Sequence, residues 1–251
     1  MRRLSLVLTA AVSVIAFSQT ATAAPVPVPV PTYSWTGFYV GGHAGYGWAD
    51  KQWTLVTSSI PLTCAQVMAF GYNCQNSHSP DGFLGGVQAG YNWQFGQWVI
   101  GVEGQWSWTD WRDSSALSMD GTDRFYTEVN WVATAAGRLG WAIDHALIYV
   151  KGGGAWVREK HWLADLGGEY MNAPAATRSG WMFGVGGEYA LWDNWSVKLE
   201  YDYMDFGSKT STLFDITGSG YWESYDIDQT IQVIMIGLNY RFGAGNSTVP
   251  R

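Results

Sequence analysis

Three observations in the sequence predict an all-β fold, an eight-stranded antiparallel up-and-down transmembrane β-barrel. Apolar and polar residues alternate with a period of two in eight segments, the repeat of a strand with two unlike faces. Tight turns and long polar connections alternate between these segments, as they do in outer-membrane barrels. Aromatic residues recur eight to ten positions apart on the apolar face, which matches the separation of two aromatic girdles at the membrane boundaries.

The beginning of the chain predicts export. Arg2 and Arg3 precede the apolar run Leu4–Phe17, and Ala21–Ala23 supplies small residues for cleavage. This pattern is typical of a secretory signal peptide over residues 1–23. The alternative, a transmembrane anchor, needs about 20 apolar residues, and this run is shorter.

The rest of the chain divides into three parts. Residues 24–34 contain alternating proline and valine and predict an extended linker. The barrel is expected over 35–242 and a tail over 243–251. Removing the two arginines of the signal peptide changes the formal net charge from -7 to -9, which argues against a nucleic-acid partner.

Each expected strand carries apolar residues on one parity and polar residues on the other. In the third strand, Trp98, Ile100 and Val102 share one face while Glu103 falls on the opposite face. A charge in hydrocarbon would cost roughly 2–4 kcal/mol, so Glu103 is expected to point into the barrel. The expected strands cover roughly 35–50, 82–95, 98–110, 125–141, 146–159, 180–191, 195–206 and 227–242.

The two faces predict two environments. The lumen is expected to hold nearly balanced charges, which favours mutual neutralisation over a selective pore, because eight strands leave an interior just wide enough for side chains. The expected lumen charges are Glu103, Glu128, Arg138, Lys151, Glu188, Lys198, Glu200, Asp202 and Arg241. The expected girdle residues are Trp93, Trp98, Trp106, Trp131, Trp141, Trp156, Trp181 and Trp195, and the outward face is expected to include Phe125 and Val129.

The connections predict the orientation in the membrane. Tight turns, which belong on the periplasmic side, are expected at Gly96-Gln97, Ala142–His145 and Trp192–Asn194. External polar loops are expected near 51–81, 111–124, 160–179 and 207–226.

The last tight turn also predicts a register. If Leu191 and Trp195 oppose each other across it, Glu188 lies opposite Lys198. Both would point into the lumen with Cβ atoms about 4.5–5.5 Å apart, where an ion pair is expected.

The two cysteines, Cys64 and Cys74, both fall in the first expected loop. In an exported chain a disulfide is the default expectation. Two free thiols are the alternative, and a metal site built from two cysteines alone is weaker still.

The remaining reactive residues predict no catalytic, cofactor or metal site. None of the four histidines, His43, His78, His145 and His161, has a second histidine or cysteine at ligand spacing. His78 and His161 fall in expected external loops, where contact with haemin or a metal stays open as an alternative. Choosing a catalytic triad from the many serines would be arbitrary, so the chain is not expected to be an enzyme.

Four segments carry a family resemblance: Trp35–Trp48, Gly85–Gln105, Gly137–Ala142 and Gly237–Phe242. They resemble the porin-family, or outer membrane protein beta-barrel, group of alphaproteobacteria, which is related to membrane domains of the OmpA/OmpX type and includes opacity-like surface antigens. The chain departs from this pattern at its end, because nine residues follow Phe242, where the family usually stops.

The resemblance implies an outer-membrane location, contact with outer-membrane lipid and lipopolysaccharide, insertion by the barrel-assembly machinery, and a monomer. Members of this group are linked to envelope integrity. The strand count and the nearly balanced lumen charges predict a structural, envelope-stabilising barrel whose loops contact external partners. A small porin or passive channel is one alternative function. A haemin or adhesion receptor that binds host surfaces or ligands through the external loops is the other.

Overall fold

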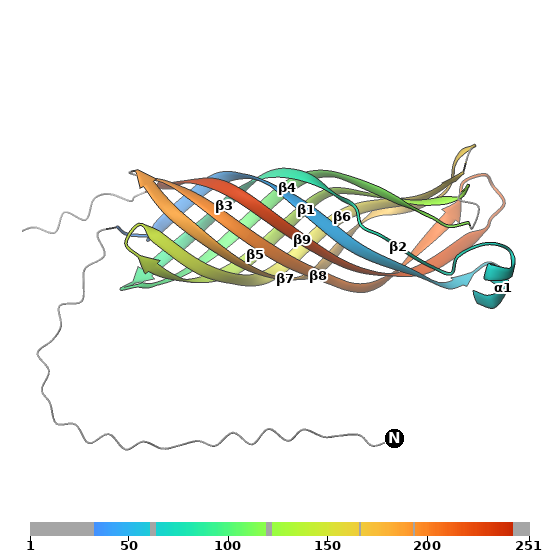
Figure 1. Ribbon diagram of the computed structural model, residues 1–251, viewed down its shortest axis with the longest axis horizontal. Coiled ribbons are helices and arrows are strands. Elements are labelled where there is room, and N and C mark those ends of the chain that lie inside the picture. Colours follow the sequence, from blue (N-terminus) through green and yellow to red (C-terminus); the bar gives the residue numbers. More distant parts are fainter. Residues whose placement is uncertain (1–32, 61–63, 119–121, 166, 193, 243–251) are drawn as a thin grey trace, which may run out of the picture. The chain divides into compact units, whose positions relative to one another are not determined.

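The computed structural model describes residues 33–60, 64–118, 122–165, 167–192 and 194–242. The described part consists almost entirely of antiparallel strands tilted around a common axis (Figure 1). In chain order the elements are β1 (Gly37–Ser58), α1 (Cys64–Ala69), β2 (Gln75–His78), β3 (Asp81–Phe95), β4 (Trp98–Ala116), β5 (Arg124–Ile143), β6 (Ala146–Asp165), β7 (Gly168–Trp192), β8 (Trp195–Asp215) and β9 (Trp222–Phe242).

Three predictions concern residues outside these ranges. The signal peptide over 1–23, the linker over 24–34 apart from its last two residues, and the tail over 243–251 are therefore neither supported nor opposed by the structure. Among the described residues, no helix is long and apolar enough to cross a membrane.

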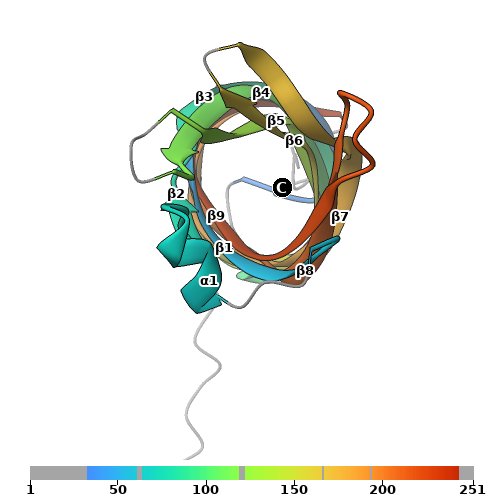
Figure 2. The same ribbon diagram turned by 90° about the vertical axis from the view of Figure 1, so that its right-hand side faces the viewer.

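The sheet closes on itself. β1 pairs with β9 from Phe38 opposite Phe242 to Ser58 opposite Glu223, so the first and last strands complete the ring that Figure 2 shows end-on. β2 and β3 both pair with β1 and together form one stave, interrupted only between His78 and Asp81 by a serine and a proline. Proline has no N–H to donate to a ladder, which accounts for the interruption. The ring therefore has eight staves, and the predicted fold class is confirmed.

Tight turns gather at one end of the barrel, here called the short-turn end. Gly96 and Asp144 adopt positive φ angles of 62° and 52° in two of them, as two-residue hairpins require. The turn predicted at Ala142–His145 is tighter, because β5 continues to Ile143 and β6 begins at Ala146.

The opposite end, here called the long-loop end, differs from the prediction. The expected loops are largely strand, since β1 runs to Ser58, β4 to Ala116 and β8 to Asp215. Apolar and polar residues still alternate there, but the polar residues now face outward and apolar residues face inward. In β1, for example, Asp50 is exposed while Trp53 is buried inside the ring. Polar side chains face outward at this level because it lies beyond the aromatic girdle, and the boundaries predicted near 51–81, 111–124, 160–179 and 207–226 are wrong for that reason.

A β-bulge in β5 corrects the predicted facing of three residues. The pairing of β5 with β6 shifts between Val129 and Trp131, so Asn130 is an extra residue and side chains before it face the opposite way. Phe125 and Val129, predicted to face lipid, are fully buried inside the barrel. Glu128, predicted to lie in the lumen, instead points outward.

The outward face carries the eight predicted girdle tryptophans. Trp98 and Trp141 stack edge to face with ring centroids 4.8 Å apart near the short-turn end. Trp106 and Trp131 stack 4.3 Å apart farther along the barrel. Trp93 and Trp195 belong with the first pair, and Trp156 and Trp181 with the second. Between the two levels most outward residues are aliphatic, such as Ile100, which is 50% exposed.

Candidate functional site: the barrel interior and the long-loop end

The barrel interior is built of five layers, and the inward residues of β6 give their order. From the short-turn end these are Leu147, Lys151, Val157, Glu159 and Leu163, each at most 2% exposed. They belong in turn to an apolar layer, an inner ion network, a central apolar layer, an outer ion cluster and an outer apolar layer. Charge and hydrocarbon therefore alternate along the lumen.

The inner ion network contains eight charged residues, all predicted for the lumen and all at most 4% exposed. Four carboxylates face four cations, so the network is formally neutral. This balance removes the need for bulk water or counter-ions in the lumen, because each buried charge has an opposite charge nearby. The members are Glu103, Glu188, Glu200, Asp202, Arg138, Lys151, Lys198 and Arg241.

Arg138 links two carboxylates of the inner ion network. Its Nη2 lies 2.9 Å from Oε2 of Glu188, and its Nη1 lies 3.5 Å from Oε2 of Glu103. Nη1 also donates a hydrogen bond of 3.0 Å to the Tyr39 hydroxyl. The guanidinium carbon lies 4.0 Å from the centre of the Tyr149 ring, a cation–π geometry. The Arg138 guanidinium therefore contacts two carboxylates, a hydroxyl group and an aromatic ring at once.

The register predicted around the β7–β8 turn is partly wrong. Glu188 does lie opposite Lys198, and Tyr189 opposite Val197, but a shift at the turn places Trp192 rather than Leu191 opposite Trp195. The predicted ion pair between Glu188 and Lys198 does not form. Glu188 instead accepts a hydrogen bond from Arg138 across the lumen and forms an ion pair with it. This is possible because long side chains reach non-neighbouring strands in a narrow barrel.

The two lysines share the other carboxylates. Lys151 Nζ lies 2.7 Å from Glu200 Oε1 and 2.9 Å from Asp202 Oδ2. Lys198 Nζ lies 3.3 Å from Glu103 Oε2 and 3.4 Å from Glu200 Oε1. Each ammonium therefore lies between two carboxylates: Lys151 joins two acids of β8, and Lys198 joins β4 to β8.

At the short-turn end the guanidinium of Arg241 completes the network. It lies 3.9 Å from Glu188 and donates a 2.8 Å hydrogen bond to the Tyr33 hydroxyl. It also lies over the Trp35 ring, 4.4 Å from its centre. Trp35 is fully buried, so the chain just before β1 closes this end of the lumen with an aromatic ring.

The outer ion cluster was not predicted. Glu159 forms an ion pair with Lys51 and lies 3.4 Å from Arg178 Nη1 and 3.2 Å from His161 Nε2. All four side chains are buried. Lys51, His161 and Arg178 lie in segments predicted to be loops, whereas Glu159 is the last residue of a predicted strand. The signal that could have identified the cluster is the alternation that continues past these predicted boundaries.

Two histidines lie elsewhere than expected. His78 and His161, predicted for external loops, are 6% and 5% exposed and point into the barrel. Thr127 Oγ1 lies 2.8 Å from His78 Nε2 and 3.1 Å from His161 Nδ1. A surface ligand therefore has no direct access to either imidazole. Nor do the described residues contain a group of three or more histidine, cysteine or acidic residues that could hold a metal ion.

Glu128 was predicted to lie in the lumen, but the structure places it on the outside of the barrel. It lies outside the ring, where its carboxylate is 3.3 Å from Arg112 Nη2, and Arg112 also lies 3.0 Å from Asp110. The Arg112 side chain is 62% exposed, so this is a solvent-exposed ion pair beyond the girdle.

Trp111 dominates the central apolar layer. It is fully buried, and its Nε1 donates a 3.0 Å hydrogen bond to the Phe83 carbonyl oxygen. The indole lies where a Cβ at Gly47 or Gly82 would come within 2.3 Å and 2.9 Å of its ring. The two glycines therefore create the space that the ring fills. Around it the layer is aliphatic and sulfur-containing, with residues such as Val132 and Met204.

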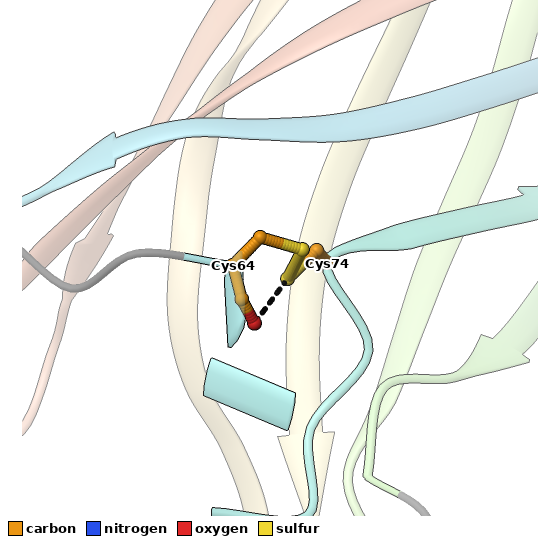
Figure 3. The surroundings of a disulfide bond; sticks show 2 residues. All are labelled: Cys64 and Cys74. Atoms are coloured by element: carbon orange, nitrogen blue, oxygen red, sulfur yellow. Dashed lines mark hydrogen bonds between the residues drawn. A yellow bond between two sulfur atoms is a disulfide. The ribbon is translucent and has the colours of Figure 1, made fainter. Parts of the chain in front are cut away.

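The predicted disulfide is present at the long-loop end. Cys64 and Cys74 are bonded with Cα atoms 5.7 Å apart, within the normal range (Figure 3). Cys74 Sγ also lies 3.1 Å from the Cys64 carbonyl oxygen, a close contact rather than a donated hydrogen bond because a disulfide sulfur carries no proton. The bond closes the segment that contains α1 and attaches it to the start of β2.

A family model for the outer membrane protein beta-barrel domain matches residues 8–242. The chain belongs to this family. Like its relatives in the family, it is an outer-membrane protein. A 31 kDa outer-membrane immunogenic protein of Brucella melitensis is 33% identical over 228 residues, which cover 84% of this chain and 85% of the relative. A 25 kDa outer-membrane immunogenic protein of Brucella abortus is 30% identical over 215 residues, covering 84% and 80%.

Among solved structures, the chain aligns with an outer-membrane protein at low sequence identity. The outer membrane protein OprG of Pseudomonas aeruginosa aligns with 82% of this chain and 97% of its own, at 10% identity and a TM-score of 0.48. A likeness at this level carries no functional comparison.

Proposed function

We propose that this protein is a closed outer-membrane barrel that stabilises the envelope and presents a rigid surface to the exterior, without steady conduction. The observation that carries the proposal is the central apolar layer. A hydrated ion would have to cross hydrocarbon between two layers of buried, ion-paired side chains. Eight strands leave no room around such a layer, because their interior is filled by side chains.

The proposal includes the surroundings that the sequence predicts. The signal peptide is removed after residue 23, the barrel-assembly machinery inserts the chain, and a monomer sits among outer-membrane lipid and lipopolysaccharide. The short-turn end faces the periplasm and the long-loop end faces outward. No enzymatic step or cofactor enters the proposal.

Single-channel recording in planar lipid bilayers tests it. Purified wild-type protein is expected to give no long-lived openings. Trp111→Ala removes the largest side chain of the central layer and should produce openings, while Trp108→Ala removes an outward-facing ring, 57% exposed, and should behave like the wild type. Large, reproducible channels from the wild-type protein would replace this proposal with the porin alternative.

The haemin-receptor alternative loses its main support. It requires an accessible imidazole in the external loops, and both His78 and His161 are buried inside the barrel. The surface role is therefore assigned to the long-loop end as a whole.

A further inference from the structure

The long-loop end contains a pocket of about 390 Å³, within the roughly 300–1,000 Å³ range of small-molecule sites. Its floor is the top of the outer apolar layer, with Leu117, Met171 and Tyr225 each at most 6% exposed. One wall comes from the disulfide-closed segment, through Phe70 and Tyr72. The pocket therefore joins a rigid base to a wall that a covalent bond holds in place.

The opposite wall comes from the connection between β8 and β9. Asp215 accepts hydrogen bonds from the backbone N–H groups of Thr217 (3.1 Å) and Ser219 (2.7 Å), which fix the course of this connection. The hydroxyl and backbone groups of Ser219 and Thr217 hold the pKa of the Asp215 carboxyl well below its usual range, so it is ionised at neutral pH. Asp215 thus shapes the wall and adds a negative charge to it.

Glu223 places a second carboxylate in the pocket lining. Its two oxygens accept hydrogen bonds from the hydroxyls of Tyr221 (2.7 Å) and Tyr225 (2.6 Å). Burial and the Glu223 carboxylate raise the pKa of Tyr221 to about 12, so its hydroxyl stays protonated and donates. A carboxylate has roughly four acceptor positions, and the two tyrosines use two of them.

The chemistry of the lining is one-sided. Two carboxylates line the pocket, and no lysine or arginine is among the described residues that line it. Five aromatic residues also line it: Phe70, Tyr72, Tyr170, Tyr221 and Tyr225. Aromatic faces attract cations, most strongly where water is excluded, and such cages recognise quaternary ammonium groups. A cavity with this lining repels an anionic ligand and attracts a cationic one.

We propose that this pocket binds a small organic cation, an ammonium group on an apolar body. The body packs on the apolar floor, the cationic head lies among the tyrosine rings, and Glu223 supplies the opposite charge. The inference adds a ligand class to the exterior end and does not depend on whether the lumen conducts, so the bilayer recordings and the binding measurements can fail separately.

Isothermal titration calorimetry on the folded, full-length barrel in detergent micelles tests the proposal with two probes of the same shape. Choline carries the positive charge, and 3,3-dimethylbutan-1-ol is its neutral counterpart. Choline should bind saturably and about tenfold more tightly than the alcohol. Equal binding of the two, or no saturable binding of choline, would overturn the proposal.

Variants locate the site. Glu223→Gln removes the charge and should weaken choline binding about tenfold. Glu169→Gln makes the same change in net charge on an exposed residue outside the pocket lining and should leave binding unchanged. Phe70→Ala gives a second measurement if Glu223→Gln folds poorly, since Phe70 is 69% exposed and its loss should weaken binding without affecting the fold. Unchanged binding in Phe70→Ala and in folded Glu223→Gln, or equal losses in Glu169→Gln and Glu223→Gln, would contradict a defined site.

Discussion

Replacing Arg138 with methionine tests how much the inner ion network contributes to stability. The side chain is 1% exposed and contacts two carboxylates that are equally buried, so its removal leaves an excess negative charge in the lumen. Removing one partner of a buried pair costs about 3–5 kcal/mol. Glu188 keeps Arg241 at 3.9 Å and Glu103 keeps Lys198 at 3.3 Å. We therefore expect the lower end of that range, a loss of about 3 kcal/mol in the free energy of unfolding.

Arg112 provides a matched control for this experiment. It too contacts two carboxylates, but its side chain is 62% exposed, so Arg112→Met should cost about 0–1 kcal/mol. Urea unfolding of the protein in phospholipid vesicles, followed by tryptophan fluorescence in both directions, measures both variants. If Arg138→Met lost no more stability than Arg112→Met, the network would be contributing little and the reasoning would be refuted.

A double-mutant cycle in the same assay should give a coupling energy of about 0.5–3 kcal/mol between Arg138→Met and Glu188→Gln, and a flat cycle would show that the 2.9 Å contact is not energetically important. Replacing both loop cysteines with serine should leave the barrel folded but speed proteolysis between β1 and β2, because the bond restrains a loop outside the ladder by about 2–3 kcal/mol; equal proteolysis would contradict this. Gly153→Ala should lower the free energy of unfolding by about 1–3 kcal/mol, since its Cβ would lie 2.0 Å from a backbone oxygen, whereas Gly137→Ala meets nothing within 4 Å and should be tolerated. On intact cells an impermeant thiol reagent should label Thr217→Cys and not Asn194→Cys, and the reverse pattern would invert the orientation.

The sequence predicts much of the barrel because the membrane imposes a simple rule on each strand. Between the girdles, outward residues must be apolar and inward charges must be paired, so the alternation around Glu103 identifies both faces. The rule fails at Asn130, where a β-bulge adds one residue to the strand. Nothing in the composition indicates this bulge, and the side chains before it therefore face the side opposite to the predicted one. It also fails beyond the girdle, where the outer solvent becomes water and the same alternation carries apolar residues inward.

It is harder to predict which lumen residues contact one another than to predict which residues face the lumen. Cross-strand register correctly placed Glu188 opposite Lys198, yet it could not give their partners. Partners inside a narrow ring are chosen in three dimensions, and Arg138 on β5 reaches Glu188 on β7 although the two strands are not neighbours. The outer ion cluster is missed for a related reason, since the three partners of Glu159 lie in segments that the sequence predicts as loops.

The length of the strands has a consequence for what the outside world meets. β5 and β6 each have 20 residues; at about 3.3 Å per residue and a tilt near 40°, such a strand rises roughly 50 Å, about twice the height of the apolar band of an outer-membrane barrel. With the short-turn end in the periplasm, as proposed, about half of the barrel's length would extend beyond the lipid as a rigid support for the loops, filled by apolar side chains and ion pairs. Antibodies, phages or host molecules approaching the cell would touch loops whose positions are fixed by this support, so their footprints should be conformational and should vanish when the protein is unfolded by heat.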